Sequence, residues 1–147
     1  MTQMATTKTD GTVPTNYTLC IKGDCPKAAT CLRHRATQMM QADVQRWSIL
    51  SPAYLVQIEG ECPHYRSAEK VRYARGFVQM MSALTVKQAH VVKDSIVATF
   101  GMNMYYRMRR GERLITPTEQ EAIYQMLEQQ GITTRPEFDA YIEDYLW

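Results

Sequence analysis

The chain has 147 residues, a charged fraction of 22% and a formal net charge of +2. A chain of this length buries roughly 70% of the surface that its unfolded form exposes, so a core can stabilise it without disulfides. No stretch approaches the roughly 20 apolar residues that span a bilayer, and residues 1–13 lack the apolar run of a signal peptide. We therefore expect a cytoplasmic protein that makes no membrane contact and keeps its thiols reduced.

The charge is distributed unevenly along the sequence. Residues 1–66 carry seven basic and five acidic side chains, residues 67–115 carry nine and three, and residues 116–147 carry one and seven. A basic middle segment is compatible with a surface that binds phosphate or nucleic acid. We favour the simpler interpretation, in which the middle and the acidic tail pack together and neutralise one another.

Residues 1–15 are polar, show no periodic apolar pattern and are expected to form a disordered tail. The remainder, residues 16–147, is expected to form a single domain. Within it, residues 16–66 contain all four cysteines and are interpreted as a cysteine-rich lobe, whereas residues 67–147 read as a helical bundle.

Short elements are expected in the cysteine-rich lobe. Tyr17, Leu19 and Ile21 alternate with polar residues, which predicts a short strand, and a second is predicted over 55–59. A helix is predicted from Lys27 to about Met40, after a proline at its first position. If the two strands pair, they deliver the last cysteine to the other three.

From Ser67 onward the apolar residues recur at the spacing of amphipathic helices. Thr85 with Gln88 and Thr116 with Glu119 form capping-box sequences, which mark helix starts. The predicted helices cover residues 67–81, 85–100, 102–110, 117–130 and 134–146.

The fold class that follows is mainly α: a small helical bundle with an N-terminal cysteine-bearing lobe. That lobe is expected to contain at most a short two-stranded β ribbon. Thr134 with Glu137 repeats the capping-box sequence, and the apolar residues after it follow the helical spacing, so the last segment is expected to pack as a helix.

Four cysteines, Cys20, Cys25, Cys31 and Cys62, give the spacing C-x4-C-x5-C-x30-C. Thiolates bind soft metals, and four of them suit a tetrahedral zinc ion or an iron–sulfur cluster. The gaps are wider than in common zinc knuckles, and neither ferredoxin pattern is complete. Zinc is the simplest interpretation, an iron–sulfur cluster is the alternative, and buried free thiols without a metal are the third.

Two histidines lie within three residues of a cysteine, and either of them, His34 or His64, could replace a cysteine as ligand. A disulfide oxidoreductase is disfavoured because the chain has no C-x-x-C pair. No nucleophile signature accompanies any cysteine, and there is no glycine-rich phosphate loop. We therefore expect a protein without catalytic residues.

A second group of residues combines tyrosines with arginines. Arginine binds phosphate with two hydrogen bonds and tyrosine stacks on bases, so the group is compatible with nucleic-acid binding. The alternative is a solvated basic helix end, because cations are favoured near a helix C-terminus. The residues are Tyr105, Tyr106, Arg107, Arg109, Arg110 and Arg113.

The runs NYTLCIKGDCPKAATCLRH, ECPHYR and YYRMRRGERLITPTEQ resemble a family of short, uncharacterised proteins from anaerobic gut bacteria of the Bacteroides group. The resemblance covers most of the chain from Asn16 onward. It implies a cytosolic bacterial setting, in which an oxygen-sensitive cluster is tolerable, and it implies no activity.

The function predicted from the sequence is that of a non-enzymatic binding or regulatory protein with a structural four-cysteine metal site, most simply zinc. A protein partner is expected. The alternatives are an iron–sulfur redox or sensing protein and a nucleic-acid-binding protein that uses residues 105–113.

Overall fold

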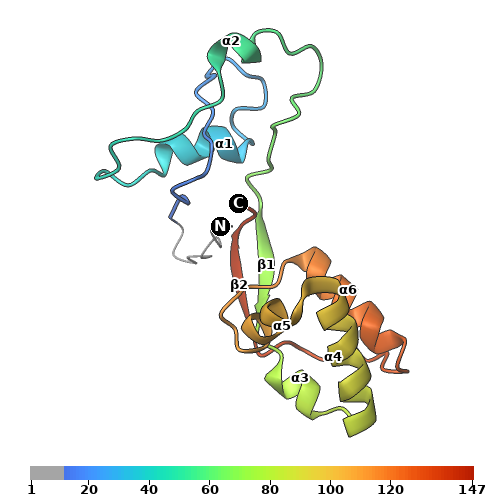
Figure 1. The fold of residues 1–147 in the computed structure, drawn as a ribbon. Helices are drawn as coiled ribbons and strands as arrows, with labels where there is room; N and C mark the ends of the chain where they lie inside the picture. Colours follow the sequence, from blue (N-terminus) through green and yellow to red (C-terminus); the bar gives the residue numbers. More distant parts are fainter. Residues whose placement is uncertain (1–11) are drawn as a thin grey trace. The chain divides into compact units, whose positions relative to one another are not determined.

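A computed structural model describes residues 12–147 and divides them into two compact units (Figure 1). Residues 71–143 form the first, here called the helical unit. Residues 12–70 together with residues 144–147 form the second, here called the thiol unit. The longer helices belong to the helical unit, whereas all four cysteines belong to the thiol unit.

The three longest helices of the described chain lie in the helical unit: α4 (Val86–Phe100), α5 (Met102–Arg109) and α6 (Pro117–Glu128). The first of them begins as predicted, on a capping box. Thr85 Oγ1 accepts a hydrogen bond from the Gln88 backbone nitrogen at 3.2 Å, and Gln88 Oε1 accepts one from the Thr85 nitrogen at 3.0 Å. Local hydrogen bonding therefore fixes where α4 starts.

The start of α6 follows the same rule. Thr116 Oγ1 accepts from the Glu119 nitrogen at 3.3 Å, Glu119 Oε2 accepts from the Thr116 nitrogen at 2.9 Å, and Pro117 occupies the first helical position. Gly101, with φ of +94°, separates α4 from α5, where the sequence predicted a stop. These predicted helix starts are confirmed.

The core of the helical unit is built from buried side chains between residues 74 and 138. Its buried members are Ala74, Phe77, Met80, Met81, Val92, Ile96, Tyr105, Met108, Ile115, Ile123, Leu127 and Phe138.

The helix predicted over 67–81 is wrong. Strand β1 (Lys70–Arg75) comes first, and the short helix α3 (Val78–Ser82) follows it. Ala74 exchanges two backbone hydrogen bonds with Ile115, at 3.0 and 2.8 Å, which a helical residue could not make. Gly76 then turns the chain with φ of +75°, a conformation that ends any regular helix.

The helix predicted over 134–146 is also wrong. Strand β2 (Ala140–Tyr145) occupies its place, and Arg135 has a positive φ of +48°, which interrupts helical geometry. β2 pairs with β1 in a two-stranded antiparallel sheet (Figure 1). The fold is therefore mixed α and β, and the prediction of a mainly helical bundle is overturned by this sheet.

Asp139, the residue before β2, connects this strand to α3 through hydrogen bonds. Asp139 Oδ2 accepts from the Val78 nitrogen at 2.8 Å and Oδ1 accepts from the Gln79 nitrogen at 3.1 Å, so this carboxylate caps α3. Its backbone nitrogen donates to the Gly76 carbonyl oxygen at 2.9 Å. A residue about sixty positions later in the chain thus caps the start of α3.

The thiol unit contains little regular structure: α1 (Leu32–Arg35), the 3₁₀ helix η1 (Ala36–Gln38) and α2 (Pro52–Leu55). The predicted two-stranded ribbon is absent from residues 12–70. Its first strand is reduced to a single parallel bridge between Leu19 and Ile49. Residues 55–59, predicted as the second strand, form no strand, and helix α2 ends at Leu55.

A small apolar cluster stabilises the thiol unit. Val13, Leu19 and Ala36 are buried together, and the rings of Tyr17 and Trp147 meet edge to face with centroids 5.0 Å apart. Of the predicted N-terminal tail, residues 1–11 lie outside the described part of the chain, and Val13 is only 4% exposed. None of the helices within residues 12–147 has both the length and the apolar character needed to cross a membrane.

Candidate metal centre

The thiol unit encloses a pocket of about 220 Å³, here called the thiol pocket. Side chains from two separate segments of the chain line it, and they include every cysteine in the sequence. All four thiols are free; one is buried and three are half-buried. The structure thus brings the predicted ligands Cys20, Cys25, Cys31 and Cys62 around one pocket.

Cys31 is held in place by backbone pairing on both sides. It forms an antiparallel bridge with Ser67, and its neighbour Leu32 donates to the Arg66 carbonyl oxygen at 2.6 Å. Ala68 donates to the Thr30 carbonyl oxygen at 2.9 Å. These bonds place the segment that follows Cys62 beside the segment that contains the other thiols.

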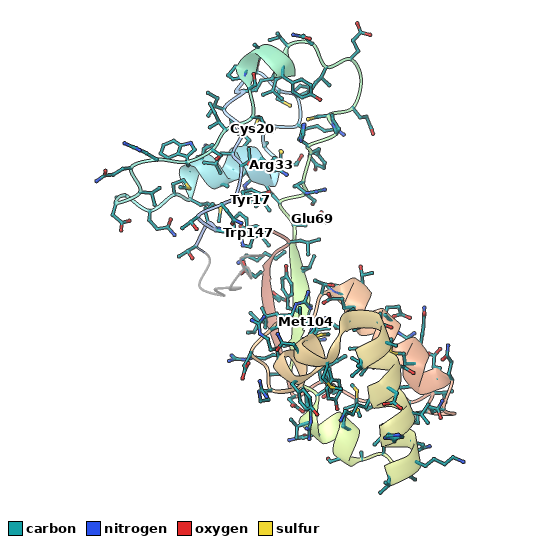
Figure 2. The ribbon with its side chains drawn as sticks, in the orientation of Figure 1. Tyr17, Cys20, Arg33, Glu69, Met104 and Trp147 are labelled. Atoms are coloured by element: carbon teal, nitrogen blue, oxygen red, sulfur yellow. The ribbon has the colours of Figure 1, made fainter. Side chains whose placement is uncertain are left out.

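Arg33, labelled near Cys20 and Tyr17 in Figure 2, connects the two cysteine-bearing segments by hydrogen bonds. Its Nε donates to the His64 carbonyl oxygen and its Nη1 donates to the Thr18 carbonyl oxygen, each at 2.8 Å. Its backbone carbonyl accepts from the Cys20 nitrogen at 3.1 Å, and its guanidinium lies 5.0 Å from the Tyr17 ring centroid. One side chain therefore fixes the chain two residues before the first cysteine and two residues after the last.

Tight turns present the other two thiols. The Cys25 nitrogen donates to the Lys22 carbonyl oxygen at 3.4 Å, and the Cys25 carbonyl accepts from Ala28 at 3.0 Å. The Cys62 carbonyl accepts from the Tyr65 nitrogen at 3.2 Å. The Tyr65 hydroxyl hydrogen-bonds to Thr30 Oγ1 at 3.2 Å, which ties this turn to the residue before Cys31.

Both candidate histidines also line the thiol pocket. His34 Nδ1 lies 3.2 Å from the Cys20 carbonyl oxygen, so a hydrogen bond there requires the proton on Nδ1 and leaves the Nε2 lone pair free. The His64 ring meets the Tyr54 ring edge to face, with centroids 5.8 Å apart. This hydrogen bond would leave one ring nitrogen of His34 available as a substitute ligand.

The thiols line the wall of the pocket and do not meet at a point. Within residues 12–147, no three His, Cys, Asp or Glu side chains are grouped closely enough to hold one metal ion. The remaining wall is apolar in part, with Leu50, Leu55 and Ile58, and cationic in part, with Lys22 and Arg33.

Sequence reasoning missed two contributors to this pocket. Arg33 was counted as one basic residue among many, and its role depends on contacts with Thr18 and His64 that no local pattern reveals. Of the apolar wall, Leu55 and Ile58 were assigned to the strand predicted over 55–59, and Leu50 was given no role. The position of Arg33 between Cys31 and His34 was the sequence feature that could have indicated its role in the pocket.

The tyrosine–arginine segment serves the helical unit's own structure. Tyr105 is 3% exposed and belongs to the core, and Tyr106 accepts a hydrogen bond from Lys93 Nζ at 3.2 Å. Arg113 forms two hydrogen bonds with Glu119, at 2.7 and 2.8 Å.

The other arginines of the segment differ from one another. Arg110 is exposed and pairs with Glu112 at 2.8 Å. Arg109 Nε is buried and has no hydrogen-bond partner within the described residues. Arg107 has an interaction partner, and the Arg107 carbonyl oxygen accepts hydrogen bonds from the Glu112 and Arg113 nitrogens. The segment therefore presents fewer unpaired cations than its sequence suggests.

A small mixed α and β chain with a pocket lined by four thiols is the class that the fold and the site define. The chain belongs to a family of unknown function, DUF6078, whose model matches residues 4–147. None of the curated proteins and none of the solved structures compared with the chain matches it. The expected relationship to an uncharacterised family is confirmed, and the Bacteroides group as its source stays a prediction.

Proposed function

We propose that the chain is a non-enzymatic binding or regulatory protein whose thiol unit is stabilised by a metal centre. The ligands in this proposal are Cys20, Cys25, Cys31 and Cys62. The observation that carries it is that all four cysteines of the sequence line one pocket although they come from two segments. Four thiolates around a common space suit zinc or an iron–sulfur cluster.

The weak core of the thiol unit also supports the proposal. Within residues 12–147, its apolar cluster has three buried members, Val13, Leu19 and Ala36, whereas the core of the helical unit has twelve. A unit with so little regular structure gains little free energy from burial alone. Metal binding contributes directly to folding free energy in such units, because the ligand set does not exist in the unfolded chain.

The pocket's charges fit an anionic centre. Lys22, Lys27 and Arg33 line it, and Glu61 is the one acidic residue among the lining side chains of the described chain. Lys27 Nζ lies 3.8 Å from Glu61 and 4.9 Å from the Tyr65 ring centroid, and both of these residues also line the pocket. Cations close to thiolates offset the negative charge that four of them would carry.

The proposal is tested by metal analysis of the full chain, purified without oxygen. We expect a stoichiometric metal centre in the wild type and its loss in Cys25→Ser. Ala29→Ser is the matched control, because it adds the same hydroxyl to an exposed position of the same turn and removes no thiol. A wild-type chain that holds no metal, and whose four thiols react freely with an alkylating reagent, would refute the proposal.

A further inference from the structure

Two positively charged side chains of the helical unit have no carboxylate partner. None of the ion pairs within residues 12–147 includes Lys93, on α4, or Arg109, the last residue of α5. Arg109 Nε is buried and donates no hydrogen bond within the described part of the chain. Because a buried donor without an acceptor costs free energy, it calls for an acceptor that these residues do not supply.

Both cations lie near the hydroxyl of one buried tyrosine, Tyr105. Burial raises the pKa of this hydroxyl above its ordinary value, and the charges of Arg109 and Lys93 oppose that rise. Lys93 Nζ also lies 5.7 Å from the centroid of the Tyr105 ring. Because α4 and α5 pack against each other within the helical unit, two helices hold the two charges beside the same side chain.

Tyr106 adds a hydroxyl group beside the lysine. Lys93 Nζ donates to Tyr106 Oη at 3.2 Å and lies 5.4 Å from the centroid of that ring. An ammonium group cannot accept a hydrogen bond, so the hydroxyl oxygen is the acceptor and its own proton remains available for another acceptor. Lys93, Tyr106 and Arg109 are all half-buried, so a small molecule can reach them.

We propose that Lys93, Tyr106 and Arg109 form a binding site for a phosphate group carried by a small molecule. A phosphate monoester carries a charge of about −1.5 to −2 at pH 7 and three acceptor oxygens, which match two cations and a hydroxyl donor. The site belongs to the helical unit, whereas the metal centre of the proposed function belongs to the thiol unit. The proposal therefore goes beyond that function and does not depend on it.

A single phosphate group fits this surface better than a nucleic-acid backbone does. Binding to a backbone uses several free cations, each of which neutralises a successive phosphate. The neighbouring arginines do not supply them. Arg110 pairs with Glu112 at 2.8 Å, and Arg113 pairs with Glu119 at 2.7 Å. The expected ligand is therefore a small phosphorylated molecule.

The test is a titration of the full chain with inorganic phosphate at constant ionic strength, followed by the shifts of backbone amides in NMR spectra. We expect saturating shifts in α4 and α5 around Lys93 and Arg109, which sodium chloride alone should not produce. Lys93→Met keeps the apolar stem but removes the charge, so it should bind phosphate about tenfold more weakly. Tyr106→Phe removes only the hydroxyl and should bind about threefold more weakly.

Lys87→Met is the matched control, because it removes an exposed lysine from the same helix. It should bind phosphate as the wild type does. Shifts that do not saturate, or equal affinities for the wild type and both site variants, would overturn the proposal. A parallel titration uses a single-stranded oligonucleotide of about ten thymidines. Saturation by phosphate with no tighter binding of the oligonucleotide supports the proposal, whereas tighter binding of the oligonucleotide would overturn it in favour of an extended nucleic-acid surface.

Discussion

Arg33 is the single side chain on which the geometry of the thiol pocket depends most. It donates to the carbonyl oxygens of Thr18 and His64 from two nitrogens of one planar group, at 2.8 Å each. Lysine cannot reproduce this fork, so Arg33→Lys should weaken metal binding by about 10- to 100-fold, as loss of an outer-shell partner does. Competition with a chelator of known affinity measures the change.

Arg35→Lys is the control, because this residue is exposed on the same short helix. It should bind metal as the wild type does. Equal affinities for the wild type and Arg33→Lys would show that backbone pairing around Cys31 suffices to hold the two segments together.

Glu119 is the residue for which acid should matter most in the helical unit. Burial raises the pKa of this carboxyl, but hydrogen bonds from Arg113 and from the Thr116 backbone outweigh it, so the pKa lies below its ordinary value of 4.5. A depressed pKa means that the stabilisation is complete above the unfolded value and disappears as the pH falls through the folded value. Because solvent screens part of this pair, Glu119→Gln should cost about 1 kcal/mol at pH 7, a difference that shrinks in acid.

Urea unfolding of both chains at pH 7 and at pH values below 4.5 measures this dependence. Glu121→Gln is the control, because the Glu121–Arg135 pair is exposed, and its effect at pH 7 should be smaller. A Glu119→Gln deficit that stays constant across the pH range would contradict the ion-pair explanation.

At the scale of elements, the predictable parts of the fold are those determined within one helical turn. The boxes at Thr85 and Thr116 lie within four residues of sequence, and both helix starts were predicted from them. The last strand was missed because Phe138, Tyr141, Ile142 and Tyr145 follow the i, i+3, i+4, i+7 spacing of a helix. The choice between the two depends on β1, which lies some seventy positions earlier and pairs with it.

Gly76 makes the turn between β1 and α3 possible. Its φ is +75°, and a Cβ atom there would lie 2.7 Å from Asp139 Oδ2 and 3.3 Å from the Arg109 carbonyl oxygen. Gly76→Ala should therefore lower the free energy of unfolding by about 1–3 kcal/mol, through backbone strain and displacement of the α3 cap. Thermal unfolding of the full chain measures this.

Gly23→Ala is the matched control, because a Cβ atom at that position would meet nothing within 4 Å. It should change stability little. If both variants unfolded at the wild-type temperature, the close approach of Asp139 to Gly76 would have no energetic importance.

At the scale of the whole molecule, the sequence indicated which residues could form a site. It did not indicate how the fold brings them together. Cysteine is rare enough that four of them in 43 positions, counted from Cys20 to Cys62, indicate shared chemistry. The space between them depends on long-range bonds, such as the pairing of Leu32 with Arg66. The volume of the pocket, about 220 Å³, has no signature in the cysteine spacing.

The division into two units leads to a prediction about metal removal. Because the thiol unit has the smaller apolar core, its stability should depend on the metal, whereas the helical unit should fold without it. Hydrogen exchange on the metal-free chain should show lost protection at amides such as Leu19 and Leu32, and wild-type protection at Ile96 and Leu127.

The metal-loaded chain provides the reference for this comparison. Loss of protection in both units together would show that they fold as one cooperative body, and unchanged protection at Leu19 and Leu32 would show that the metal does not contribute to folding.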